Sequence, residues 1–176
     1  MGYIIRIDDR LLHGQVIEGW VKPLKIEKIV VASDVVSCDP LQRSLYLVST
    51  PEAVKLECLS LESTSEKIVA GEFEKIKTII LISSLKELYD LVLKIKNTIF
   101  NFLPPPVNVG GIRHIESRVQ IYKALFLSLE DLEIIKKLDA LNVKLEYYVL
   151  PDDPKILINE KILEIEEIVK SKKRYL

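Results

Sequence analysis

The chain alternates short runs of Ile, Val and Leu with longer stretches in which apolar residues recur at every third or fourth position. The short runs predict β-strands, and the longer stretches predict amphipathic helices. Strands are expected at residues 3–8, 28–32, 55–59, 78–82, 107–109, 119–126 and 144–149. Helices are expected at 14–21, 40–49, 62–70, 85–95 and 129–141, and in a C-terminal segment, 159–176, that ends in a basic tail.

Short motifs mark several ends of these elements. Asp39-Pro40 is typical of an N-cap residue followed by Pro at the first helical position. A Ser with an acidic residue three positions later predicts a capping box at Ser84–Glu87 and another at Ser128–Asp131. Gly110-Gly111 is expected to form a turn with positive φ.

The order of these elements predicts the fold class. Strands that alternate with helices form βαβ units, and such units build a mainly parallel sheet. We therefore expect an α/β fold, an open twisted sheet with helices on both faces, as a single domain over residues 1–176. Open sheets of this kind bind ligands at the carboxyl ends of their strands. This rule indicates the loops at 8–14, at 33–39 and at 83–84.

Composition and charge narrow the class of protein. Apolar residues make up 48% of the chain, which is enough for a core, and the net charge is −1. A near-neutral chain argues against broad nucleic-acid binding. The chain has no apolar run of the roughly 18 residues that a membrane helix needs, and charges near its start argue against a signal peptide. Cys38 and Cys58 form no CxxC pair. We expect a cytoplasmic protein.

The best candidate for chemistry is the segment from Asp8 to Gln15, where the first strand leads into the first helix. A helix start offers free backbone N–H groups and a positive dipole end, which together favour phosphate. Arg10 adds a charged, bidentate donor, and Gly14 lets the backbone come close to a ligand. Asp8 or Asp9 could accept a ring N–H of His13 and fix its tautomer. His13 would then be a neutral nucleophile that carries a covalent intermediate.

Other interpretations of these residues remain open at this point. An isolated His near a strand end can simply be a hydrogen-bonded structural residue, and acidic residues beside Arg10 can form a surface ion pair of little energetic value. Ser84 could donate to a phosphate, although its role as an N-cap already explains it. No metal site is predicted, because His13 and His114 show no ligand spacing.

The string from Arg6 to Val16, with Trp20 and Lys22 after it, resembles the signature of a known family. The family is the mannose/fructose/sorbose-type enzyme IIB component of the bacterial phosphoenolpyruvate-dependent sugar phosphotransferase system. The resemblance spans about residues 3–158. Three further stretches resemble the family in the same order: 29–34, 108–112, and 129–138 running on to 151–154.

The resemblance implies a function and a set of partners. It implies that His13 accepts a phosphoryl group on Nδ1 from a phosphorylated IIA component and passes it to a sugar at the membrane IIC/IID transporter. Arg10 and the backbone around Gly14 and Gln15 would bind the phosphoryl group, and no cofactor is needed. The protein would be cytoplasmic and peripheral to the inner membrane through its transporter. The sequence leaves the sugar and the oligomeric state open, a homo-oligomer included.

One stretch departs from the family pattern. After Asn-Val-Gly-Gly the chain has Ile112-Arg113-His114, where relatives usually carry Met and then an aromatic residue or His. Two alternative functions therefore remain: a regulatory IIB-like protein that is phosphorylated on His13 but signals to a protein partner, and a non-catalytic α/β binding module.

Overall fold

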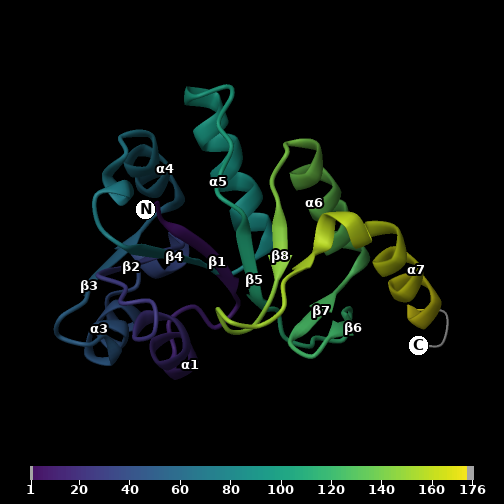
Figure 1. Ribbon diagram of the computed structural model, residues 1–176, viewed down its shortest axis with the longest axis horizontal. Coiled ribbons are helices and arrows are strands. Elements are labelled where there is room, and N and C mark those ends of the chain that lie inside the picture. The colour runs from purple at the N-terminus through teal and green to yellow at the C-terminus, as the bar shows by residue number, and fades with distance from the viewer. Residues whose placement is uncertain (1, 174–176) are drawn as a thin grey trace.

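The predicted sheet is present in the computed structural model, which describes residues 2–173 (Figure 1). Its seven strands have the order β3-β2-β4-β1-β5-β8-β9, and all neighbouring strands pair in parallel except β9, which is antiparallel to β8. The expected fold class, an open and mainly parallel sheet, is therefore confirmed. The strands of this sheet are β1 (Ile4–Asp8), β2 (Lys28–Ala32), β3 (Lys55–Leu59), β4 (Thr78–Ile82), β5 (Val107–Gly111), β8 (Leu145–Tyr147) and β9 (Ile156–Leu157).

Helices connect the parallel strands, as the sequence pattern predicts. They are α1 (Gly14–Val16), α2 (Asp34–Ser37), α3 (Pro40–Ser49), α4 (Leu61–Val69), α5 (Leu85–Thr98), α6 (Leu129–Ala140) and α7 (Ile162–Lys173). Three other helical turns are the π-helical η1 (Ile17–Val21) and the 3-10 turns η2 (Glu72–Glu74) and η3 (Ile158–Lys161). The predicted C-terminal helix is thus present, while residues 174–176 of its basic tail lie outside the described residues.

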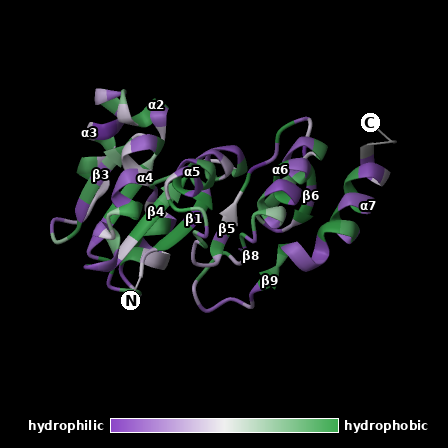
Figure 2. Cartoon of the chain, turned by 90° about the horizontal axis from the view of Figure 1, so that it is seen from above, coloured by the Kyte–Doolittle hydropathy of each residue, from purple (hydrophilic) through white to green (hydrophobic). Residues whose placement is uncertain are grey.

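Helices cover both faces of the sheet. Helices α4, α5 and α6 lie on one side of the sheet, and α1 and α3 lie on the other (Figure 1). The apolar side chains of α4, α5 and α6 belong to one buried cluster, and those of α1, η1, α2 and α3 belong to a second. Helix α7 packs against α6 and β6 and joins the first cluster. Neighbouring residues of a strand serve opposite faces, so that Ile80 joins the first cluster and Ile79 the second. Strand β4, next to the central strand β1, is buried along its whole length and is coloured mainly as hydrophobic in Figure 2.

Most of the predicted caps are found. Asp39 accepts hydrogen bonds from the backbone N–H groups of Leu41 and Gln42, and Ser128 and Asp131 form a complete capping box. The box expected at Ser84 is only half formed. The Ser84 hydroxyl accepts from Glu87 N–H, but the Glu87 carboxylate bonds to Ser83 instead of the Ser84 backbone.

Two sequence-based expectations about local structure are wrong. Gly110-Gly111 is the end of β5 and has no positive φ, so it is not a turn. The expected strand at 119–126 is a hairpin of β6 (Val119–Tyr122) and β7 (Leu125–Leu127), since a turn interrupts the apolar run. The expected helix at 14–21 is present, but only α1 is α-helical and the rest is η1, a π-helical form that is frequent near functional sites.

Candidate functional site

The segment that follows β1 is a tight turn at the carboxyl edge of the sheet. Leu11 N–H donates to the Asp8 carbonyl at 2.9 Å, and Leu11 has a φ of 53°, a conformation that costs energy for a residue with a side chain. The Leu11 side chain is buried in the apolar cluster around η1, which holds the turn in place. His13 follows this turn and stands at the N-cap position of α1.

His13 presents its two ring nitrogens to different surroundings. Nε2 is buried and lies 3.2 Å from Oδ1 of Asp8, a close contact without the linear geometry of a full hydrogen bond. Nδ1 has no protein partner among the described residues and is not among the buried nitrogens. The side chain is 17% exposed, so the contact with Asp8 leaves Nδ1 as the nitrogen that a reaction partner can reach.

Asp8 links His13 to a buried arginine. Its second carboxylate oxygen, Oδ2, accepts a hydrogen bond from Arg6 Nη2 at 2.8 Å. Burial alone would raise the pKa of Asp8, but the contacts with His13 and with the Arg6 guanidinium outweigh it, and the pKa lies below its ordinary value. Asp8 is therefore a carboxylate at neutral pH and can hold a proton on Nε2 of His13.

Arg6 lies in the middle of an apolar strand and is only 3% exposed. Its Nη1 donates to Asn108 Oδ1 at 2.5 Å and to the Val149 carbonyl at 3.3 Å, and its guanidinium stacks 4.7 Å from the ring of Trp20. Burial lowers the pKa of Arg6, and the charge of Asp8 opposes this effect. Asn108, Val149 and Trp20 therefore hold the Arg6 guanidinium in place, and the guanidinium in turn holds the Asp8 carboxylate through its hydrogen bond.

The guanidinium of Arg6 fits inside the protein because Gly110, on the neighbouring strand β5, has no side chain. A Cβ at Gly110 would lie 1.9 Å from Cζ of Arg6, a distance that no side chain can adopt. Sequence analysis did not identify Arg6, Asn108 or Gly110 as site residues. The signal was present in two places: a cation inside an apolar strand, and an Asn-x-Gly pattern in the strand that pairs with it.

Arg10 and Gln15 lie together on the exposed side of the site. Arg10 Nη2 donates to Gln15 Oε1 at 2.7 Å, and Arg10 Nε lies 3.8 Å from Asp8 Oδ1. The Arg10 side chain is 52% exposed, so a bound anion could replace the neutral Gln15 as its partner. A Cβ at Gly14 would meet nothing within 4 Å, which leaves open space beside the start of α1.

Asp9 makes no hydrogen bond or ion pair with His13 in the described part of the chain. Its carboxylate accepts the backbone N–H of Arg113 at 2.9 Å, and its own N–H donates to the Gly111 carbonyl at 3.1 Å. Of the two acidic residues that sequence analysis considered as partners of His13, the structure brings Asp8 to the imidazole and uses Asp9 to tie the turn to the end of β5.

Ser84 lies at the same edge of the sheet, because β1 and β4 pair in register from Ile4 and Ile79 up to Ile7 and Ile82. Within the described chain its hydroxyl contacts only the N–H of Glu87. The neighbouring Ser83 hydroxyl is bound by the Glu87 carboxylate at 2.5 Å. The structure thus places Ser84 near the candidate site but not in contact with His13.

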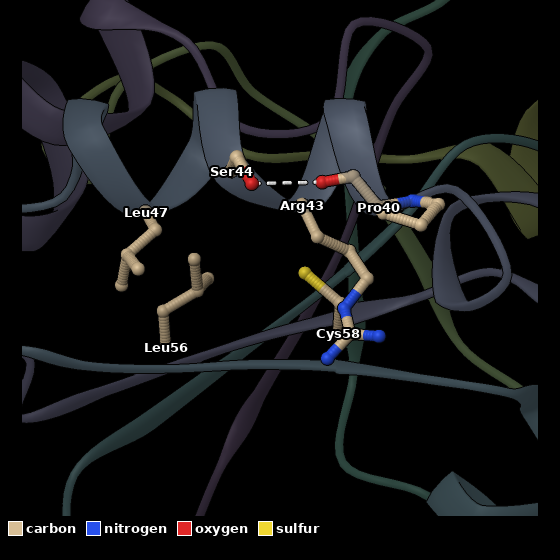
Figure 3. Close-up of a pocket in the computed structure, with 6 residues that line it drawn as sticks. All are labelled: Pro40, Arg43, Ser44, Leu47, Leu56 and Cys58. Atoms are coloured by element: carbon tan, nitrogen blue, oxygen red, sulfur yellow. Dashed lines mark hydrogen bonds between the residues drawn. The ribbon is translucent and has the colours of Figure 1, made fainter.

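A separate hollow lies between α3 and β3 (Figure 3). It has a volume of about 370 Å³ and is lined by Pro40, Arg43, Ser44, Leu47, Leu56 and Cys58. Burial raises the pKa of the Cys58 thiol, with Arg43 opposing this effect, so the thiol stays protonated near neutral pH. This hollow therefore offers no activated nucleophile that competes with His13.

Residues 2–173 contain no cluster of three or more His, Cys, Asp or Glu side chains that could hold a metal ion. In the same part of the chain, no helix has the length and apolar character to cross a membrane.

A histidine beside an arginine, at the carboxyl edge of a parallel α/β sheet, is an arrangement suited to a phosphotransferase domain. The family model described as "PTS system sorbose subfamily IIB component" matches residues 3–174, and the chain belongs to this family. The resemblance noted in the sequence is confirmed.

Known relatives agree with this assignment. The chain is 29% identical to the "PTS system fructose-specific EIIB component" of Bacillus subtilis, over 85% of this chain and 88% of the relative. It is also 29% identical to the "PTS system sorbose-specific EIIB component" of Klebsiella pneumoniae, over 92% and 94% of the two chains. The crystal structure of the IIB domain of the K. pneumoniae sorbose permease superposes with a TM-score of 0.79 at 28% identity, covering 93% of this chain and 98% of that one.

Membership of this family identifies the general activity of the protein. The protein is a phosphocarrier of a sugar phosphotransferase system, and IIB components of such systems work with a IIA component and a membrane transporter. A further relative, the "PTS system mannose-specific EIIAB component" of Escherichia coli, is 28% identical over 93% of this chain but only 49% of the relative's length.

Proposed function

We propose that Nδ1 of His13 accepts the phosphoryl group from a phosphorylated IIA component and that the group then passes to a sugar at the membrane IIC/IID transporter. The single observation that carries this proposal is the contact of the buried Nε2 with Asp8, which leaves Nδ1 as the ring nitrogen that a partner can reach. The protein would act in the cytoplasm, at the inner membrane, through contact with that transporter.

The geometry supplies what phosphoryl transfer requires. The lone pair of Nδ1 attacks phosphorus while the bond to the donor histidine breaks, and the proton on Nε2 stays in contact with Asp8. The phosphorylated imidazole carries positive charge, which the Asp8 carboxylate stabilises. Transfer depends mainly on in-line positioning and on charge stabilisation at the phosphoryl oxygens. Arg10, released from Gln15, and the N–H groups of Gly14 and Gln15 would provide this stabilisation.

The test is intact-mass spectrometry after incubation with phosphoenolpyruvate, enzyme I, HPr and a mannose-family IIA component. We expect one phosphate on the wild type and none on His13→Ala. His114→Ala is the matched control, because His114 is the only other histidine and is exposed; it should be phosphorylated like the wild type. Phosphate on His13→Ala would overturn the assignment. Failure of the wild type, with the donor IIA shown to be phosphorylated, would favour a non-catalytic module.

A second step separates transport from regulation. Phosphorylated protein is mixed with membranes that contain the matching IIC/IID transporter and a set of candidate sugars. Release of sugar phosphate supports the transport role. Stable phosphohistidine under these conditions, with the same membranes active toward another IIB component, would support a regulatory protein.

A further inference from the structure

The loop after β5 carries an exposed arginine beside the turn that holds His13. The side chain of Arg113 is 72% exposed, and its backbone N–H is fixed by the Asp9 carboxylate at 2.9 Å. Because Asp9 also donates its own N–H to Gly111, two hydrogen bonds join this loop to the His13 turn. The base of Arg113 is therefore anchored while its guanidinium extends into solvent.

The guanidinium of Arg113 has N–H groups that are not used in hydrogen bonds within the described chain. Nε lies 3.3 Å from Asp9 Oδ2, and within residues 2–173 the guanidinium makes no hydrogen bond to protein. By contrast, the next arginine along this segment, Arg118, is held by Asp131 through two hydrogen bonds. A guanidinium with unused N–H donors is suited to bind phosphate oxygens in a bidentate way.

The loop that carries Arg113 lies beside the residues that contact His13. A Cβ at Gly111 would lie 3.8 Å from the Asp8 carboxylate, and the same carboxylate is 3.2 Å from His13 Nε2. Arg113 follows Gly111 by two residues, a step of at most about 7 Å along the chain. These contacts put the base of Arg113 on the β5 side of the His13 turn, and its long, exposed side chain is able to turn toward a group attached to His13.

We infer that Arg113 is a second phosphate-binding arginine, which contacts the phosphoryl group on His13 in addition to Arg10. This inference rests on the proposed phosphorylation of His13. Arg113 forms and breaks no covalent bond. It donates N–H hydrogen bonds to phosphoryl oxygens while the P–N bond forms at His13 and the P–N bond of the donor breaks, and the donor histidine keeps the bonding electron pair. Asp9 keeps Arg113 in place and is a positioning residue.

The test is a ³¹P NMR titration of the isolated phosphoprotein, because this measurement needs no partner. A nearby guanidinium favours the dianionic phosphoryl group and lowers its pKa. We expect Arg113→Gln to raise the apparent pKa of the phosphoryl group by about 1, with Arg113→Lys in between. We also expect Arg113→Gln to accept the phosphoryl group from IIA about tenfold more slowly.

Lys96→Gln is the matched control. It removes the same charge from the last turn of α5, at the opposite edge of the sheet from His13, and should titrate like the wild type. Equal titration curves for wild type and Arg113→Gln would overturn the inference, even if transfer from IIA became slower, since that pattern indicates partner docking. If Arg113→Gln accumulates too little phosphoprotein, Arg113→Lys gives the titration.

The experiment distinguishes failure of the inference about Arg113 from failure of the proposed function of His13. If the wild type itself takes up no phosphate, the proposed role of His13 fails and this inference fails with it. If the wild type is phosphorylated and the Arg113 variants titrate normally, only the role of Arg113 is lost. Circular dichroism of each variant shows whether the fold is kept, which the exposure of Arg113 leads us to expect.

Discussion

The guanidinium of Arg6 occupies the space directly above Gly110, where an added Cβ would lie 1.9 Å from Cζ. The two residues are 104 positions apart, since 110 − 6 = 104, and they meet because β1 and β5 pair with Arg6 opposite Asn108. The absence of a side chain at Gly110 is what lets Arg6 reach Asp8. Four predictions follow from this relationship and from the contacts around it.

Gly110→Ala should displace Arg6 and break its pair with Asp8. Loss of one partner of a buried ion pair costs about 3–5 kcal/mol, and we expect a decrease of this size in the free energy of unfolding. Urea denaturation followed by circular dichroism measures it. Gly111→Ala is the control, because a Cβ there meets Asp8 only at an ordinary contact distance of 3.8 Å. Similar stability of both variants would contradict the packing described for Arg6.

Asp8→Asn should change the pH dependence of stability. The pKa of Asp8 is lower in the folded protein than in the unfolded chain, so its contribution is complete above the ordinary pKa of about 3.9 and is lost as the pH falls through the folded value. We expect the free energy of unfolding of the wild type to fall more steeply than that of Asp8→Asn from about pH 5 to about pH 3. Parallel curves for the two proteins would remove Asp8 as a stabilising carboxylate.

Arg10→Lys should slow phosphoryl transfer without loss of stability. The side chain is half exposed and contacts Gln15, so little packing is lost, but Lys cannot bind two phosphoryl oxygens in the geometry of a guanidinium. We expect about a tenfold lower rate in a single-turnover assay, which corresponds to about 1.4 kcal/mol in the barrier. Thermal denaturation provides the check on folding. A rate equal to that of the wild type would place Arg10 outside the reaction.

Trp20→Phe should weaken the contacts that hold the Arg6 guanidinium in place. The indole N–H donates to the Val149 carbonyl at 2.9 Å, and this hydrogen bond is lost while an aromatic ring remains. The expected decrease in the free energy of unfolding is about 1 kcal/mol. Tyr148→Phe is a useful comparison, because it keeps the ring that packs against Trp20. No change in the denaturation midpoint of Trp20→Phe would mean that this hydrogen bond contributes nothing.

The regular part of the fold could be predicted because it depends on short-range patterns. The strands expected at 28–32, 55–59 and 78–82 have these bounds in the structure. The first and the last are nearly continuous apolar runs, which are typical of buried parallel strands, whereas 55–59 is a half-buried strand at the edge of the sheet. Gly110-Gly111 was misread because a glycine pair usually signals a turn. Glycine is instead required at position 110 because Arg6 approaches it from a neighbouring strand. This approach depends on the register of the sheet, which local sequence does not contain.

The residues of the candidate site likewise fall into those that local sequence brings together and those that only the sheet register brings together. His13, Asp8 and Arg10 lie within one short segment, so sequence alone could group them. The choice of Asp8 over Asp9 required the direction of each side chain at the end of β1. Arg6 and Asn108 were missed because their partnership joins strands that are far apart along the chain.

The position of β1 in the centre of the sheet has a consequence for folding. His13 follows β1 closely in the sequence, yet Arg6 and Trp20 both bond to the Val149 carbonyl, which lies 143 and 129 residues further along. The backbone of β1 is also unpaired until both β4 and β5 lie beside it. Contacts between such distant residues form slowly, so the support of the His13 turn depends on a nearly complete fold. A partly folded molecule would therefore not take phosphate from the donor.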